Sequence, residues 1–148
     1  MEIRIAPFEP RDQLEVKQLI LAGLAEHFGF LDPTKNSDLE DIATSYAHAT
    51  FLVAHSQTER CIVGCGALVP RSPQHGEIVR MSVRNTRRGQ GIGTMLLNAL
   101  IDAAHAQGMS RIILETTETW DDAIAFYTRN QFRITHFSNG EVYFERWL

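Results

Sequence analysis

The segment from Glu77 to Gln107 constrains the fold of this chain more than any other. Its first part, Glu77–Val83, has the composition of a strand, and Gly91–Gln107 repeats apolar residues at the helical period. Between them lies a turn rich in arginine and glycine, Arg87–Thr94. The unpaired N–H groups and positive dipole end of a helix start suit a phosphate, and glycines let the backbone approach it. A tight loop with no ligand is the alternative, but it does not explain the two arginines, so we predict a phosphate site.

The composition limits what else the chain does. Its 148 residues, 44% of them hydrophobic and 22% charged, suit one domain spanning residues 1–148 with its own core. A net charge of −4 disfavours a broad basic surface, so we expect no nucleic-acid partner. No apolar run approaches the roughly 20 residues of a membrane helix, and the N-terminus does not resemble a signal peptide. We therefore expect a cytoplasmic protein without a membrane partner.

The cysteines and histidines predict neither a disulfide nor a metal site. Cys61 and Cys65 fall in one expected strand, where four residues span about 13 Å, too far for a disulfide. Their spacing does not match a zinc motif, and His27, His75 and His105 have no metal-ligand spacing. We expect both cysteines to be reduced core residues and the protein to need no metal.

The remaining elements are predicted from periodicity and turn residues. Strands are expected at residues 1–7, 50–55, 61–69, 76–83, 111–116, 132–137 and 141–147, and helices at 11–28, from 37 onward, at 91–107 and at 119–129. The order is βααβββαβαββ, a mixed α/β domain.

Three details of the helices are specific enough to test. The first helix should bury a stripe of Leu14, Leu19, Ile20, Leu24 and Phe28. The Ser37–Glu40 segment has the form of a capping box that opens a helix with Leu39, Ile42, Ala43 and Tyr46 inward. Thr119 is expected to cap the helix that carries Tyr127.

The glycine turn fits one phosphate motif and not two others. It lacks the Gly-Lys-Ser/Thr ending of the phosphate loop, and Thr94 stands where the dinucleotide fingerprint needs its third glycine. Arg88-Gly89-Gln90-Gly91-Ile92-Gly93 matches Arg/Gln-x-x-Gly-x-Gly/Ala, the acyl-CoA pyrophosphate signature. With Leu96-Leu97, the strand at 112–115 and Ala123–Tyr127 following in order, the chain resembles the GNAT superfamily of N-acetyltransferases.

The resemblance implies a fold and a co-substrate. The fold is a single GNAT-like domain with a mixed, mostly antiparallel sheet of about seven strands and about four helices. The co-substrate is acetyl-CoA. Its pyrophosphate would be bound by Arg87, Arg88, Gly89, Gln90, Gly91, Ile92, Gly93 and Thr94, and its pantetheine arm would pair with Met81, Ser82 and Val83.

The resemblance also implies catalytic roles for Tyr127 and Glu77. A phenol with a pKa near 10 can protonate the leaving thiolate, and a carboxylate in a partly dry cleft can deprotonate the amine. The alternatives are that Tyr127 only packs and that Glu77 is an ordinary charged residue at a strand start. The function expected is direct acetyl transfer to a primary amine of a small molecule or peptide in a ternary complex. The alternative is a non-catalytic acyl-CoA-binding sensor.

Two residues depart from the family pattern. Trp120 replaces the usual Asn and Gln131 the usual Gly, which suggests that Asn130 takes the left-handed position at the helix end. The acceptor would bind near Trp120 and a segment at the end of the first helix, nominated as Glu26, His27, Phe28, Phe30 and Asp32. A solvated helix end is the alternative for that segment, and a homodimer is left open.

Overall fold

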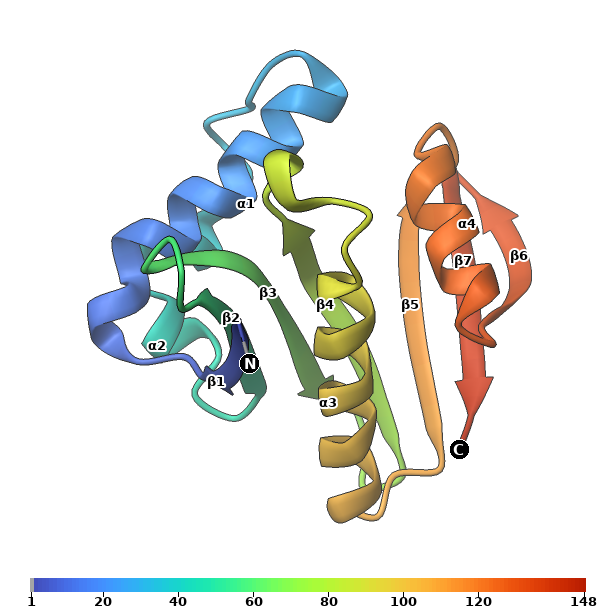
Figure 1. The fold of residues 1–148 in the computed structure, drawn as a ribbon. Coiled ribbons are helices and arrows are strands. Elements are labelled where there is room, and N and C mark those ends of the chain that lie inside the picture. Colours follow the sequence, from blue (N-terminus) through green and yellow to red (C-terminus); the bar gives the residue numbers. More distant parts are fainter. Residues whose placement is uncertain (1) are drawn as a thin grey trace.

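The computed structural model describes residues 2–148 and has the predicted order of elements (Figure 1). The strands are β1 (Ile3–Pro7), β2 (Thr50–Ser56), β3 (Cys61–Pro70), β4 (His75–Val83), β5 (Arg111–Thr117), β6 (Arg133–Ser138) and β7 (Glu141–Trp147). The helices are α1 (Gln13–Phe28), α2 (Ile42–Ser45), α3 (Ile92–Ala106) and α4 (Asp121–Arg129), with 3-10 turns η1 (Pro10–Asp12), η2 (Ser37–Glu40) and η3 (Asn85–Arg87). The predicted α/β fold class is therefore confirmed.

All seven strands form one sheet in the order β1-β2-β3-β4-β5-β7-β6. Neighbouring strands are antiparallel except β4 and β5, which are parallel. These two pair only from His75–Arg111 to Glu77–Ile113, although both continue well beyond that point. Figure 1 shows them diverging from there, so that the sheet opens between its two halves.

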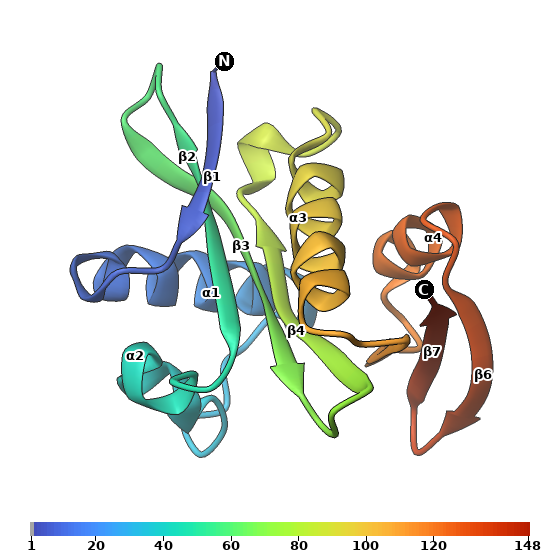
Figure 2. The same ribbon diagram turned by 90° about the horizontal axis from the view of Figure 1, so that it is seen from below.

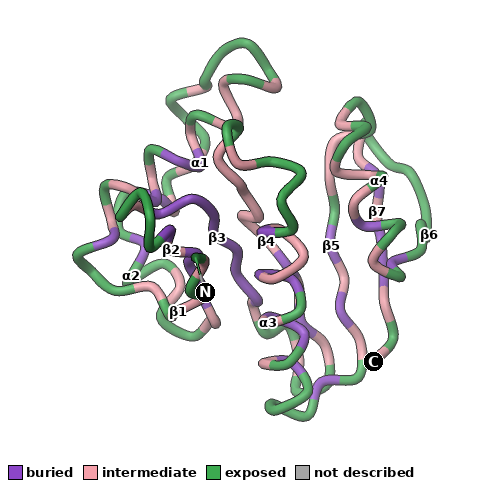
Figure 3. The backbone as a smooth tube through the Cα atoms, in the orientation of Figure 1, coloured by how far each residue is buried: buried purple, intermediate pink, exposed green. Residues whose placement is uncertain are grey.

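Helices cover the two faces of the sheet with separate cores. α3 and α4 pack on one face, where α3 residues such as Leu96 and Leu100 meet Ile78 of β4 and Ile112 of β5. α1 and α2 cover β2 and β3 on the other face through residues such as Val16. Figure 2 shows α2 and α3 on opposite sides of these strands. The buried backbone in Figure 3 follows the strands and the inner side of α3.

The second predicted helix differs from its prediction. Ser37–Glu40 forms only a 3-10 turn after Asn36 in the left-handed conformation, with no side-chain cap, so the expected capping box is wrong. The α-helix begins after Asp41, whose carboxylate accepts a hydrogen bond from Thr44 N. Leu39 and Ile42 are buried as predicted, but Ala43 is exposed.

Smaller errors concern the other helices. In α1, Leu19 and Ile20 are buried, whereas Leu14 and Phe28 are 66% and 42% exposed, and Val16 takes an inward position instead. The N-cap of α4 is Trp120 without a side-chain hydrogen bond, so Thr119 does not cap it.

Both cysteines are free thiols, Cys65 buried and Cys61 partly buried. Over residues 2–148, no helix combines the length and the apolar character needed to cross a membrane.

Candidate active site

The divergence of β4 from β5 opens a cavity of about 680 Å³ in the middle of the molecule. One wall is β4 from Ile78 to Val83, and the opposite wall is α4 with Phe126 and Tyr127. The start of α3 closes one end, and α1 contributes Ile20 and Leu24. Beyond Glu77 the edge of β4 is not paired with β5. An extended ligand with amide groups can therefore pair with it as an added strand would.

The glycine turn forms the end of the cavity that suits an anion. Gly89 and Gly91 have φ values of +77° and +84°, and an added Cβ would meet no atom within 4 Å at either position. These glycines are thus required by the backbone conformation and not by lack of space. Gly91 is the N-cap of α3, and the first intrahelical hydrogen bond runs from Met95 N to Gly91 O at 3.0 Å. The N–H groups of Ile92, Gly93 and Thr94 precede that bond and are available to a phosphate.

The two arginines of this turn have different partners. Arg88 Nη1 donates to Glu26 Oε1 on α1 at 2.7 Å, and both side chains are nearly half exposed. Arg87 forms ion pairs with Glu2 and Glu59 and donates from Nε to Gln90 Oε1 at 2.8 Å. Arg87 therefore ties the turn to β1 and to the β2–β3 turn, whereas Arg88 is the more accessible guanidinium for an anion.

Gly93 lets α3 and α4 come close across the cavity. A Cβ at this position would lie 3.2 Å from the ring of Phe126, tighter than ordinary contact. Any side chain at this position would push against the Phe126 ring on α4. The third glycine thus has a packing role that differs from that of Gly89 and Gly91.

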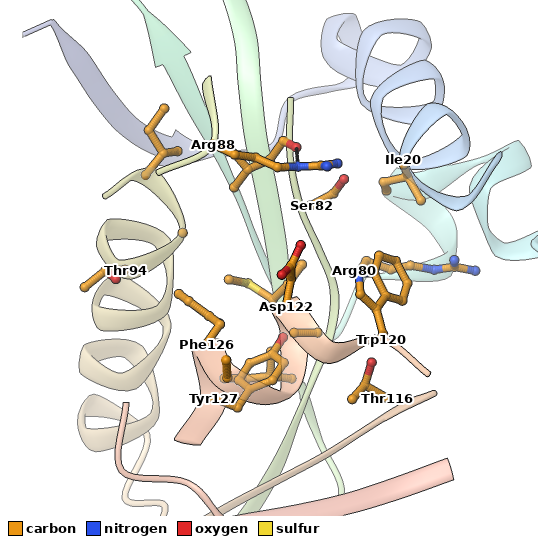
Figure 4. Close-up of a pocket in the computed structure, with 18 of the residues that line it drawn as sticks. Ile20, Arg80, Ser82, Arg88, Thr94, Thr116, Trp120, Asp122, Phe126 and Tyr127 are labelled. Carbon is orange, nitrogen blue, oxygen red and sulfur yellow. Dashed lines mark hydrogen bonds between the residues drawn. The ribbon is translucent and has the colours of Figure 1, made fainter. Parts of the chain in front are cut away.

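Tyr127 lies on α4 with its hydroxyl directed into the cavity (Figure 4). The ring is 8% exposed and packs against Phe132 and Phe144 at centroid distances of 5.7 and 5.9 Å. Burial raises the pKa of its phenol above the ordinary value of 10.0. Such a phenol stays protonated at neutral pH, so its O–H is present in the cavity as a donor.

Glu77 stands at the point where β4 and β5 part, since Glu77–Ile113 is their last pair. The cavity lining begins at the next residue, Ile78. The carboxylate accepts from Arg71 Nε at 2.8 Å and also lies 2.6 Å from Arg71 Nη2. Held by Arg71 in this way, the Glu77 side chain is 18% exposed.

The end of α1 reaches across to the start of α4. The His27 ring stacks on Trp120 at 4.2 Å with an interplanar angle of 6°, and Phe28 lies edge-on to Trp120 at 6.0 Å. Trp120 also lines the cavity, in the place where the sequence pattern would have Asn. The Asp32 carboxylate accepts hydrogen bonds from the N–H and the hydroxyl of Thr34, at 2.9 and 2.7 Å.

The structure brings most of the predicted site residues together. Those that line the cavity are Met81, Ser82, Val83, Arg87, Arg88, Gly89, Gly91, Ile92, Gly93, Thr94 and Tyr127. Of the other two, Gln90 is exposed beside Arg87, and Glu77 borders the cavity as described. Residues that the sequence analysis did not assign to the site include Arg80 and Phe126. The tight approach to Gly93 explains Phe126, but no local signal indicated Arg80.

The helix end behind Tyr127 also differs from its prediction. Gln131, with φ +67°, occupies the left-handed position, and Asn130 has φ −99°. Asn130 Nδ2 instead donates to Phe126 O at 2.8 Å, which satisfies a carbonyl near the end of α4. Within residues 2–148, no group of three or more His, Cys, Asp and Glu side chains could hold a metal ion.

Comparison with known proteins agrees with this geometry. Residues 18–132 match the model of the acetyltransferase (GNAT) family. The chain is 35% identical over 115 residues to an IAA acetyltransferase of Azospirillum brasilense, covering 76% of this chain and 74% of that protein. The chain belongs to the GNAT family. It is therefore a GNAT-type acyltransferase.

Other acetyltransferases extend the comparison. N-acetyltransferase 8F1 of Rattus norvegicus is 34% identical over 106 residues, which cover 67% of this chain but only 47% of that protein. The fold matches that of a GNAT-family acetyltransferase from Staphylococcus aureus Mu50, with a TM-score of 0.88, 24% identity and 99% coverage of both chains. It also matches the PaiA N-acetyltransferase of Thermoplasma acidophilum in complex with coenzyme A, with a TM-score of 0.86, 17% identity and full coverage of both chains.

Proposed function

We propose that this GNAT-family chain transfers the acetyl group of acetyl-CoA to a primary amine of a small molecule or peptide, by direct attack within a ternary complex. The observation that carries the proposal is the open edge of β4 facing Tyr127 across one continuous cavity that ends at the glycine turn. A pyrophosphate at that turn and a thioester near Tyr127 are joined by a pantetheine arm along β4. The coenzyme A complex of the PaiA relative supports the choice of ligand.

In this proposal the pyrophosphate is bound by the N–H groups from Arg88 to Thr94 and by the Arg88 guanidinium. Phosphate oxygens replace Glu26 on Arg88, because a multiply charged anion competes well with one half-exposed carboxylate. Met81, Ser82 and Val83 supply the backbone that pairs with pantetheine. Binding thus fixes the thioester without any contribution from the acetyl group itself.

The chemical step needs a base, an acid and a polarised carbonyl. The neutral amine attacks the thioester carbonyl carbon, a C–N bond forms, and the C–S bond breaks as the electron pair leaves on sulfur. Tyr127 donates its proton to the departing thiolate. Glu77 accepts the amine proton through water, from its position at the strand divergence.

Thiol release from acetyl-CoA tests the function across a panel of amines, amino acids, polyamines and peptides, with the acetylated product identified by mass spectrometry. Direct transfer predicts intersecting lines in double-reciprocal plots of the initial rate when the concentrations of acetyl-CoA and the amine are both varied. Parallel lines would indicate an acetylated enzyme and contradict the ternary complex. Tight acetyl-CoA binding with no thiol release for any amine would instead indicate an acyl-CoA-binding sensor.

The role of Glu77 has its own test. Glu77→Gln should lower kcat while leaving the affinity for CoA unchanged, because Glu77 lies outside the cavity lining. Glu9→Gln is the matched control, since Glu9 is an exposed carboxylate that forms an ion pair with Arg11 and does not line the cavity. An unchanged kcat in Glu77→Gln would assign deprotonation of the amine to water or to another group.

A further inference from the structure

The strand β4 contains a bulge within the segment that lines the cavity. Its pairing with β3 steps from Cys65–Ser82 directly to Ala67–Val79, so that Arg80 and Met81 together face the single residue Gly66. Arg80 has φ +56°, a left-handed conformation that a long side chain rarely adopts. The bulge sets the direction of the backbone at Met81, where the pantetheine arm is proposed to pair.

Contacts from three directions hold this conformation. Arg80 donates to Asp38 twice, from Nε to Oδ2 at 3.0 Å and from Nη2 to Oδ1 at 2.7 Å. The Tyr46 hydroxyl donates to the same Asp38 Oδ2 at 2.5 Å. From the neighbouring strand β3, Cys65 Sγ donates to Arg80 O at 3.3 Å. A Cβ on Gly66 would lie 2.3 Å from Met81 Sδ, so glycine at this position lets the Met81 side chain lie against β3.

The ion pair with Asp38 is different in kind from a surface pair. The side chains of Arg80 and Asp38 are 21% and 32% exposed, and the bidentate geometry is the strong form of this interaction. Asp38 lies in η2, in the connection between α1 and α2, so the pair fastens that connection to the strand of the active site. Figure 4 shows Arg80 extending away from Tyr127, so its guanidinium is not aimed at the reacting atoms.

We propose that the Asp38–Arg80 ion pair holds the β4 bulge in the conformation that acetyl transfer needs, which makes Asp38 a positioning residue of the active site. This inference rests on the proposed function, because the bulge matters only if the thioester lies along β4. Without the pair, residue 80 returns to the extended conformation that non-glycine residues prefer. The bulge then relaxes, and the backbone at Met81 turns away from the ligand.

The left-handed conformation of Arg80 provides a sharp test. In an Asp38→Asn background, which leaves no unpaired carboxylate, Arg80→Gly and Arg80→Ala both remove the guanidinium. Glycine adopts a positive φ freely, whereas alanine does not. We expect the glycine variant to exceed the alanine variant in kcat by about fivefold to thirtyfold, the ratio that the steric cost of a left-handed Cβ predicts. Equal activity of the two variants would overturn the proposal.

The single variant Asp38→Asn should lower kcat and raise the KM for acetyl-CoA, because the backbone at Met81 no longer pairs with the pantetheine arm although the pyrophosphate turn is unchanged. Glu40→Gln is the matched control. Glu40 lies in the same turn and pairs with Lys17 on α1 at 3.0 Å, but this exposed pair does not touch β4. Glu40→Gln should leave kcat unchanged. A similar loss of kcat in Glu40→Gln would mean that kcat depends on the α1–α2 connection as a whole and not on the Asp38–Arg80 ion pair.

Hydrogen exchange on the ligand-free protein gives a readout that needs no activity. Amides of residues 78–83 should exchange faster in Asp38→Asn than in the wild type, and should be unaffected in Glu40→Gln. If the exchange changes as expected but the wild type transfers no acetyl group, the proposed function is wrong, whereas the Asp38–Arg80 ion pair still holds the β4 bulge. If the wild type is active and Asp38→Asn matches it in both exchange and kcat, the inference itself is wrong.

Discussion

Arg88 is expected to contribute more to acetyl-CoA binding than to folding. In the free protein its partner is Glu26, and both side chains are nearly half exposed, 43% and 46%. Loss of such an exposed pair costs only about 0.2–1 kcal/mol of stability. A hydrogen bond between a guanidinium and a phosphate contributes about 1.5–3 kcal/mol. Arg88→Ala should therefore weaken CoA binding by about tenfold to hundredfold while the melting temperature of the free protein changes little.

Glu26 gives the complementary change. Because its carboxylate competes with phosphate for the same guanidinium, Glu26→Gln should tighten CoA binding, by up to about fivefold. Isothermal titration calorimetry with CoA measures both variants. Arg11→Ala is the control, since Arg11 is 76% exposed and pairs with Glu9 before the start of α1. Unchanged affinity in Arg88→Ala, or weaker binding in Glu26→Gln, would refute the assignment of the pyrophosphate to this turn.

Three further predictions concern single side chains. Gln131→Gly should raise the free energy of unfolding by about 1 kcal/mol, because Gln131 has φ +67°, and a melting curve that does not shift upward would contradict this. A thiol reagent at pH 8 should label Cys61 in the folded protein, but Cys65 only after unfolding, because Cys65 is buried and burial raises its pKa to about 12. Rapid labelling of both thiols in the folded protein would contradict this prediction. Hydrogen bonds from Ser56 and Thr58, together with the ion pair to Arg87, lower the pKa of Glu2 from 4.5 to about 2. The contribution of the Glu2 carboxylate to stability is therefore present above pH 4.5 and lost as the pH falls towards 2. The difference in melting temperature between wild type and Glu2→Gln should shrink over that range, and a constant difference would contradict the cause given.

The glycine turn and the helix that follows could be predicted from the sequence because their signals are local. Gly89 and Gly91 stand where the backbone needs a positive φ, and the apolar period of α3 sets its buried face. The role of Arg80 could not be predicted in this way. Its left-handed conformation depends on Asp38, 42 residues away in the chain.

Local signals also failed where two residues compete for one position. Asn130 and Gln131 both follow α4, and intrinsic preference favours the asparagine for the left-handed conformation. The hydrogen bond from Asn130 to Phe126 O instead keeps Asn130 near the helix and moves the turn to Gln131. Similarly, Asp41 rather than Ser37 caps α2, because the chain forms only a 3-10 turn before it.

Single-turnover acetyl transfer by Tyr127→Phe tests the account most directly. The substitution removes only a hydroxyl that faces the cavity, so CoA affinity and melting temperature should stay close to those of the wild type. If the buried phenol protonates the leaving thiolate, the rate of transfer to an accepted amine should fall by about a hundredfold or more. Transfer at the wild-type rate would contradict the proposed chemistry in this cavity.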